Sequence, residues 1–263
     1  MDLGLKNKIA LITGSSRGLG YATALILAQE GARLAINSRD PDKLSAAGKK
    51  IKDLTENEPF MIVGDVAAAQ TPKNVVDQTV KHYGGLDILV TNAGGPPAGN
   101  FESFSDEDWQ KAIDLTFLSH VRLIRYALPV LKQSKTPSVL TITSYSVKQP
   151  IPNLVLSNSI RAATVGLTKS LALEMAKEGI RFNSILPAWT DTDRVQELMA
   201  ARARLNNTTI EEEIQKQAKD SPMGRMATPE EFARAAAFLV SPVASYITGV
   251  MLSIDGGMYK GLF

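Results

Sequence analysis

Residues 13–20 of the chain read Thr13-Gly14-Ser15-Ser16-Arg17-Gly18-Leu19-Gly20. An apolar run, residues 9–13, leads directly into this stretch. Glycines after a strand let the backbone turn sharply and let a pyrophosphate approach the positive end of the following helix dipole. The spacing is GxxxGxG, whereas the usual dinucleotide fingerprint is GxGxxG. The stretch therefore predicts a strand, a nucleotide-binding turn and a helix. The alternative is that its glycines only form a tight turn.

Short apolar runs recur along the whole chain, and amphipathic segments separate them. The runs cover residues 9–13, 33–37, 60–63, 87–91, 138–143, 181–186 and 251–254. Because they are continuous and do not alternate with polar residues, they are typical of strands buried on both faces. The sequence predicts one α/β domain over residues 1–263. Its core is a Rossmann-type, doubly wound parallel sheet of about seven strands with helices on both faces.

Several predicted helices have clear ends. A side-chain acceptor followed by proline marks three helix starts, at Asp40-Pro41, Thr71-Pro72 and Thr228-Pro229. Such pairs place the acceptor at the N-cap and the proline at the first helical position. Ser105 with Asp108 indicates the start of a long helical segment to about Leu131, and Gly179 ends a second one that begins near Leu154.

Composition excludes several classes of site. The 263 residues include no cysteine and two histidines. Disulfides, cysteine nucleophiles and Cys-ligated metals are therefore excluded, a three-histidine site is impossible, and no metal site is predicted. Lys+Arg number 29 and Asp+Glu 27, giving a net charge of +2 with no basic stripe, so no nucleic-acid partner is expected. No signal-peptide core or membrane-length apolar run is present, which predicts a soluble cytoplasmic protein without membrane contact.

The glycine stretch also matches the GxSxG nucleophile elbow of hydrolases, with Ser16 as the nucleophile. A triad would then need a histidine after a late strand. His82 precedes a turn and His120 lies within a helical pattern, so a serine hydrolase is a remote alternative.

The end of the second predicted strand bears on cofactor choice. In dinucleotide folds an acidic residue there binds the adenosine ribose, whereas a basic residue accommodates a 2′-phosphate. Here the strand ends in Asn37-Ser38-Arg39, and Arg17 supplies a second cation. These residues predict NADP(H) in preference to NAD(H). The alternative is that both arginines are solvated surface residues.

Over nearly its whole length the chain resembles the short-chain dehydrogenase/reductase family, of the 3-oxoacyl-acyl-carrier-protein reductase-like kind. Besides the glycine stretch, the resemblance is carried by Gly64-Asp65-Val66, Asn92-Ala93-Gly94 and the closing residues 253–257. It implies that Asp65 contacts the adenine ring and that Asn92-Ala93-Gly94 lines the cofactor. The predicted cofactor-binding residues are Gly14, Ser16, Arg17, Gly18, Leu19, Gly20, Ser38, Arg39, Asp65, Val66, Asn92, Ala93, Gly94 and Pro187.

The catalytic positions of that family match less well. The family serine is present as Ser144, but its Tyr-x-x-x-Lys motif falls on Ser157 and Arg161, and its helical asparagine falls on Asp114. The proline-glycine after the sixth strand is Pro187-Ala188. The resemblance therefore implies a catalytic set of Ser144, Ser157, Arg161 and Asp114 in which only the serine is conserved in type.

These changes remove the expected acid. An aliphatic hydroxyl cannot replace a phenol as a proton donor, and an arginine stays charged and cannot shuttle a proton. Tyr145 and Lys148, both after the fifth strand, are a candidate replacement pair, although a loop tyrosine is more often a packing residue. The resemblance predicts an NADP-dependent oxidoreductase acting on CH–OH/C=O, with a 3-oxoacyl thioester as one candidate substrate. A cofactor-binding pseudoenzyme or sensor is the alternative.

Residues 189–221 fall where the family carries its substrate-covering lid. Their basic residues could attract an acidic carrier or coenzyme A, or could lie on a solvated helical pair; they are Arg194, Arg202, Arg204, Lys216 and Lys219. The resemblance also implies a homo-oligomer, most often a tetramer. A face of small residues, Ala162, Gly166 and Ser170, would let two helices approach closely.

Overall fold

Within residues 1–262, the strands form one parallel sheet of seven strands in the order β3-β2-β1-β4-β5-β6-β7. The structure is a computed structural model and describes residues 1–262. The strands are β1 (Ile9–Ile12), β2 (Arg33–Ser38), β3 (Phe60–Val63), β4 (Ile88–Thr91), β5 (Ser138–Ile142), β6 (Arg181–Pro187) and β7 (Met251–Ile254). The chain runs outward from β1 to β3 and then returns to β4 on the other side of β1. The predicted fold class is confirmed.

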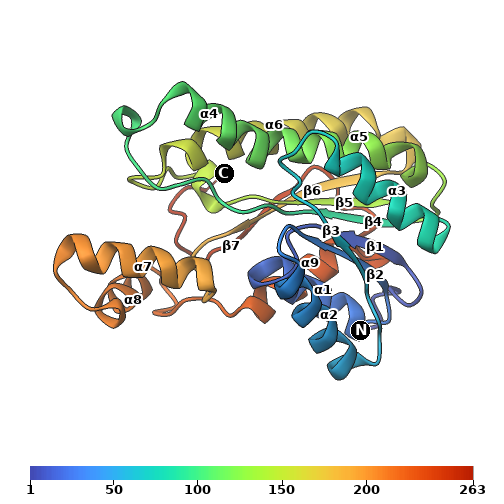
Figure 1. The fold of residues 1–263 in the computed structure, drawn as a ribbon, viewed down its shortest axis with the longest axis horizontal. Helices are drawn as coiled ribbons and strands as arrows, with labels where there is room; N and C mark the ends of the chain where they lie inside the picture. The colour runs from blue at the N-terminus through green and yellow to red at the C-terminus, as the bar shows by residue number, and fades with distance from the viewer. Residues whose placement is uncertain (263) are drawn as a thin grey trace.

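Helices cover both faces of this sheet (Figure 1). One face carries α1 (Gly18–Gln29), α2 (Pro41–Thr55) and α9 (Pro229–Val240), and the other carries α3 (Thr71–Tyr83), α4 (Asp106–Ile113), α5 (Ser119–Leu131) and α6 (Val155–Glu174). Two further helices, α7 (Asp193–Asn206) and α8 (Ile210–Lys219), lie beyond the strand ends. Short 3₁₀ turns occur at Phe101–Ser103, Tyr145–Val147, Ala176–Glu178 and Pro242–Ala244.

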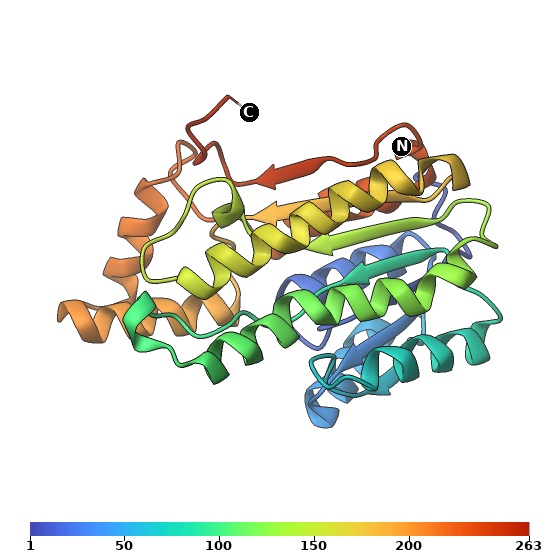
Figure 2. The same cartoon turned by 90° about the horizontal axis from the view of Figure 1, so that it is seen from above.

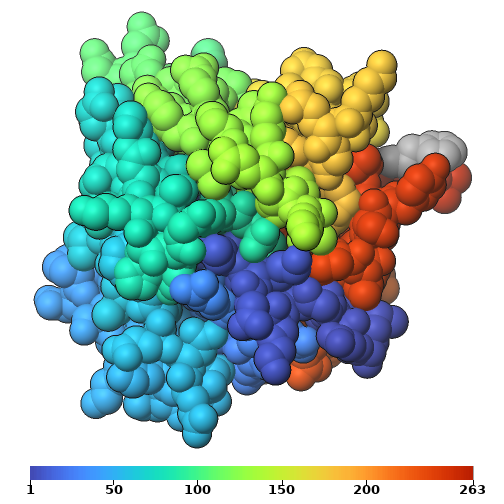
Figure 3. Space-filling model, turned by 90° about the vertical axis from the view of Figure 1, so that its right-hand side faces the viewer, coloured from blue at the N-terminus to red at the C-terminus, as the bar shows by residue number. Residues whose placement is uncertain are grey.

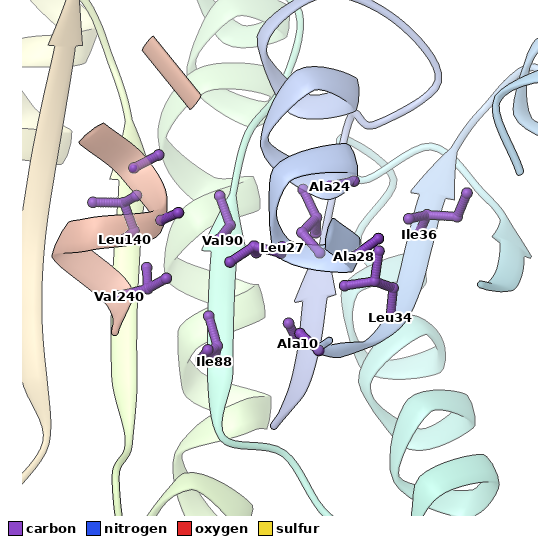
Figure 4. Packing of buried hydrophobic residues seen from close by; sticks show 14 of the residues in the cluster. Ala10, Ala24, Leu27, Ala28, Leu34, Ile36, Ile88, Val90, Leu140 and Val240 are labelled. Atoms are coloured by element: carbon purple, nitrogen blue, oxygen red, sulfur yellow. The ribbon is translucent and has the colours of Figure 1, made fainter. Parts of the chain in front are cut away.

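Apolar packing on both faces explains why the strand runs are continuous. On the α1 face, strand side chains such as Leu34 and Val90 meet Ala24, Leu27 and Ala28 of α1 (Figure 4). The alanines bring α1 close to the sheet. Leu27, Leu34 and Val90 have no exposed surface. Moving one such side chain from water into the core stabilises the fold by about 1.5–3 kcal/mol.

Three of the predicted helix starts are confirmed. The Asp40 side chain accepts a hydrogen bond from the Lys43 amide at 3.1 Å, and Ser105 and Thr228 each form a capping box with the acidic residue three positions on. The predicted N-cap at Thr71 is wrong. The Asn74 amide donates to the Gln70 carbonyl at 3.3 Å, so the helix begins one residue earlier and Gln70 is its N-cap.

The long segment after Ser105 is not one α-helix. A π-helical turn, η2 (Asp114–Leu118), separates α4 from α5. Such turns change which groups the backbone carbonyls face. Here the Thr116 carbonyl accepts a hydrogen bond from the Thr164 hydroxyl of α6 at 2.7 Å. The α-helix that begins near Leu154 ends earlier than predicted, at Glu174. Gly179, with a left-handed φ of 75°, instead ends the short 3₁₀ turn Ala176–Glu178 that follows.

All strands point toward α7 and α8, which lie at the carboxyl edge of the sheet (Figure 2). The opposite edge is covered by the N-terminal segment and by the ends of helices on the α3 and α5 side (Figure 3). Open α/β sheets bind ligands outside the carboxyl ends of the strands, where the strand order reverses. The reversal between β1 and β4 places the functional site at the α7 edge.

Candidate active site

A cleft of about 590 Å³ follows the carboxyl edge of the sheet, a size typical of ligand sites. Parallel strands end at the same edge, so residues far apart in the sequence meet there. The predicted residues that line the cleft are Gly14, Ser16, Arg17, Gly18, Leu19, Ser38, Arg39, Asp65, Val66, Asn92, Ala93, Gly94, Ser144, Ser157, Arg161 and Pro187. Two predicted residues do not line it, Gly20 and Asp114.

The glycine turn is held by Asn92, the first residue after β4. The Asn92 side-chain amide donates to the Gly14 carbonyl at 3.0 Å, and Gly14 has a left-handed φ of 57°. A Cβ at Gly20 would overlap this same Gly14 carbonyl. Gly20 does not line the cleft and instead lets α1 pack closely against the turn, so its predicted contact with the cofactor stays a prediction.

The hydrolase alternative has no triad in this structure. Ser16 Oγ shares a hydrogen bond with Ser38 Oγ at 2.9 Å. The buried His120 ring is bonded to Thr91 Oγ1 at 2.6 Å, and the His82 ring is stacked on Phe60. Burial, and secondarily Arg161, lowers the pKa of His120 to about 3. Neither histidine can activate Ser16.

Three cations surround the end of the cleft nearest β2. Arg17 pairs with Glu197 of α7 at 3.1 Å, Arg39 is 3.9 Å from Asp65, and Lys43 pairs with Asp40. Sequence reasoning missed Lys43, whose place in the first turn of α2 was the available signal. All these pairs are exposed to solvent, so each is weak and can rearrange around a bound anion.

The lining of the cleft leaves room for a dinucleotide close to the backbone. Gly94 lines it, and a Cβ there would meet no protein atom within 4 Å, so it would project into the open space. Gly18 also lines it with a left-handed φ of 58°. Backbone cradles of this kind let phosphates and sugars approach closely. Together with the nearby cations, they fit a dinucleotide with an additional phosphate.

The other end of the cleft contains the residues expected to be catalytic. Ser144 follows β5, and its Oγ accepts a hydrogen bond from the Ser146 amide at 3.1 Å. Ser157 and Arg161 lie one turn apart on α6, and both are buried. Arg161 Nη1 donates to the Thr143 carbonyl at 3.1 Å. Burial, and secondarily Arg194, lowers the pKa of Arg161 to about 10, so this end of the cleft holds a fixed cation at neutral pH.

The predicted Tyr145–Lys148 acid pair does not form. Tyr145 lines the cleft but packs in an apolar cluster with Ile151 and Trp189, and burial raises the pKa of its phenol. Lys148 instead lies 5.3 Å above the centre of the Tyr259 ring. Because the 3₁₀ turn directs the two side chains to different partners, no ammonium lowers the pKa of Tyr145.

Asp114, the fourth residue of the predicted catalytic set, does not line the cleft. It lies at the start of the π turn, where its carboxylate pairs with Arg122 at 3.1 Å and accepts a hydrogen bond from Gln110. The residue from this turn that does line the cleft is Leu115. The π turn thus rotates Asp114 toward α5.

Residues 189–221 form the helical pair α7 and α8, and α7 borders the cleft. Among the basic residues that the sequence singled out in this segment, Arg194 lines the cleft and donates a hydrogen bond to the Pro96 carbonyl at 3.1 Å. Arg202 is instead stacked on Trp189, and Lys216 is paired with Glu213. Arg17 connects the glycine turn to α7 through Glu197, so the helix closes one side of the cleft.

Residues 1–262 offer neither a metal site nor a membrane-spanning helix. No group of three or more His, Cys, Asp or Glu side chains could hold a metal ion. No helix in this range has the length and apolar character needed to span a bilayer.

The sheet order, the glycine turn and the lining of the cleft define a dinucleotide-binding protein of the Rossmann type. Residues 14–259 match a family model described as enoyl-(acyl carrier protein) reductase. The chain is 31% identical over 254 residues to a 3-oxoacyl-[acyl-carrier-protein] reductase of Chlamydia muridarum, a match covering 97% of this chain and 98% of the relative. It belongs to the short-chain dehydrogenase/reductase family, a family of oxidoreductases, as the sequence predicted.

Two solved structures that resemble this chain were determined with NADPH bound. The L-sorbose reductase of Gluconobacter frateurii, complexed with NADPH and L-sorbose, is 33% identical, with a TM-score of 0.95 and 100% coverage of both chains. An NADPH-bound short-chain oxidoreductase of Pseudomonas aeruginosa is described as containing an atypical catalytic center. It is 29% identical, with a TM-score of 0.88 and coverage of 97% of this chain and 99% of that one.

Proposed function

We propose that the protein is an NADP(H)-dependent oxidoreductase that interconverts a carbonyl and a secondary alcohol. The observation that carries this proposal is the single cleft, which joins the glycine turn and its cations to Ser144, Ser157 and Arg161. The NADPH complexes of similar proteins support the choice of cofactor. When bound, the dinucleotide supplies or accepts the hydride.

The chain's own residues would stabilise charge on the substrate. A carbonyl oxygen gains negative charge as it is reduced, and a hydrogen-bond donor and a nearby cation stabilise it. The Ser144 hydroxyl can donate to that oxygen while its Oγ still accepts from the Ser146 amide. Arg161 is fixed by the carbonyls of Ile142 and Thr143, so its charge is already positioned.

Proton transfer is the weak part of this site. The Ser157 hydroxyl is a poor acid, Arg161 remains charged, and Tyr145 has a raised pKa. We therefore expect slow turnover with a proton taken from water. The test is NADPH consumption with a panel of ketones that includes acetoacetyl-coenzyme A as the thioester candidate. Tight NADPH binding with no consumption on any carbonyl would instead support the pseudoenzyme.

Cofactor preference gives a direct prediction. NADPH should bind more tightly than NADH, because Arg17, Arg39 and Lys43 line the same end of the cleft. Arg39→Ala should weaken NADPH binding by about tenfold to a hundredfold, the usual loss of a charge-assisted contact, and leave NADH binding unchanged. Calorimetry on both cofactors makes the measurement.

Lys50→Ala is the matched control, because it removes the same charge from an exposed position of α2. It should change neither affinity. Equal dissociation constants for NADPH and NADH in the unaltered protein would contradict the prediction, as would an Arg39→Ala variant that keeps its preference.

The outer face of α6 suggests how copies of the chain assemble. We propose a homotetramer, since the outer face of α6 exposes Ala162, Gly166 and Ser170, and Leu173 is 72% exposed. Closed symmetry commonly buries such faces. A Cβ at Gly166 meets no atom within 4 Å, so Gly166→Trp should fold normally but shift the protein to smaller species. Sedimentation at micromolar concentration checks this, and a monomeric wild type would disprove it.

A further inference from the structure

Arg161 is a buried cation without an acidic partner. Arg161 is 8% exposed, and its Nη1 donates hydrogen bonds to the backbone carbonyls of Ile142 and Thr143. Among residues 1–262, no carboxylate lies within ion-pair distance of it. Buried charges in proteins are normally paired, because leaving water without a counter-charge is costly. The cleft side of this guanidinium therefore lacks an anion.

A second arginine faces the same space. Arg194 reaches in from α7, and its Nε and Nη2 lie 3.8 Å from the position that a Cβ on Gly95 would take. Arg161 Nη2 lies at the same distance from that position. The acidic neighbour of Arg194 is Glu197, which is 3.8 Å away, half exposed and shared with Arg17. The two guanidiniums are thus close together with little compensating charge.

The other residues that line this part of the cleft are hydroxyl and apolar side chains, which suit a ligand with a small polar group attached to an apolar chain. The Ser157 hydroxyl makes no hydrogen bond within the described chain and, like Ser144, lines the cleft. Ile151, Leu154 and Leu198 line it as well. Two arginines can hold a carboxylate in the planar, bidentate geometry that guanidinium groups favour.

We propose that the substrate is an oxo-carboxylate whose carboxylate binds between Arg161 and Arg194, while its carbonyl oxygen faces Ser144. This inference rests on the proposed oxidoreductase function and names its substrate class. The phosphates of the cofactor are the competing anions. The glycine turn and Arg17 lie at the β1–β2 end of the cleft, whereas Arg161 lies on α6 beyond β5. Arg194 shares Glu197 with Arg17 and thus links the two ends, so the binding test is made with the cofactor in place.

Binding can be measured without turnover by loading the protein with NADP⁺, which has no hydride to give to a carbonyl. Calorimetry would compare acetoacetate with methyl acetoacetate, and pyruvate with methyl pyruvate. In at least one pair the acid should bind about tenfold to a hundredfold more tightly than its neutral ester. Arg194→Gln should remove most of that difference while leaving ester binding unchanged.

The control is Arg204→Gln, which removes the same charge from an exposed position of α7 and should preserve the acid preference. Arg161→Lys should retain part of it, because the charge remains but the bidentate fork is lost. Since Arg161 is buried and its variants can misfold, the partly exposed Arg194 gives the decisive variant.

Equal affinity for acid and ester in both pairs would overturn the inference, as would equal effects of Arg194→Gln and Arg204→Gln. Acid binding that occurs only without NADP⁺ and is displaced by it would assign the arginines to the cofactor phosphates and also overturn it. If the acid preference is found but NADPH reduces none of the acids or ketones, the inference stands as a binding site and the proposed oxidoreductase function fails.

Discussion

Gly14→Ala is expected to lower the free energy of unfolding by about 2–5 kcal/mol and to abolish tight NADPH binding. Gly14 has a φ of 57°, a conformation that costs an alanine about 1–2 kcal/mol. The added Cβ would also lie 2.8 Å from the Asn92 side-chain nitrogen and 2.9 Å from the Asn92 carbonyl oxygen, and such overpacking costs about 1–3 kcal/mol.

The effect on binding follows from the same contact. The Asn92 amide that the new methyl group would displace is the one that holds the Gly14 carbonyl. Thermal unfolding should show a Tm lower by about 4–20 °C, with no added stabilisation by NADPH. Gly85→Ala is the control, since its Cβ would meet Ile9 at an ordinary 3.7 Å. Similar Tm values for the two variants would contradict this account of the turn.

The fold could be predicted because its signals are local and repeated. Continuous apolar runs mark buried parallel strands, and the Thr228 capping box marks a helix start wherever the rest of the chain lies. One error is a one-residue shift of a helix start, from Thr71 to Gln70. The larger error lies where a distant hydrogen bond decides. The π turn brings the Thr116 carbonyl to Thr164 of α6, a contact that no short window of sequence contains.

The site shows the same division. Asn92, Ser144 and Pro187 could be assigned to one cleft because each lies at the carboxyl end of a parallel strand, and such strands end at a common edge. Side-chain direction within a turn could not be predicted. Tyr145 and Lys148 are neighbours in the sequence, yet one packs near Trp189 and the other lies over Tyr259. Arg161 and Arg194 are distant in the sequence, and they lie close together only because α7 folds back across the cleft.

The double change Ser157→Tyr with Arg161→Lys is expected to raise turnover of neutral ketones about 10²–10⁴-fold, the usual contribution of a positioned acid. The two positions lie one turn apart on α6 and line the cleft with Ser144. A tyrosine hydroxyl can reach into this space, and an adjacent ammonium lowers its pKa from about 10. NADPH consumption with methyl acetoacetate, followed from pH 6 to pH 10, measures the gain.

Ser157→Phe with Arg161→Lys is the control, because it fills the same space without an acidic hydroxyl and should give no gain. The double variant Ser157→Tyr with Arg161→Lys should also lose its preference for oxo-carboxylates, since a lysine ammonium cannot bind a carboxylate in the bidentate geometry of a guanidinium. Loss of wild-type activity in Tyr145→Phe would contradict this account by showing that the buried phenol is the acid. Brisk wild-type turnover that survives both Tyr145→Phe and Ser157→Ala would also contradict the expected slow rate. Water or the substrate would then be an efficient proton source, with Ser144 and Arg161 stabilising the oxyanion.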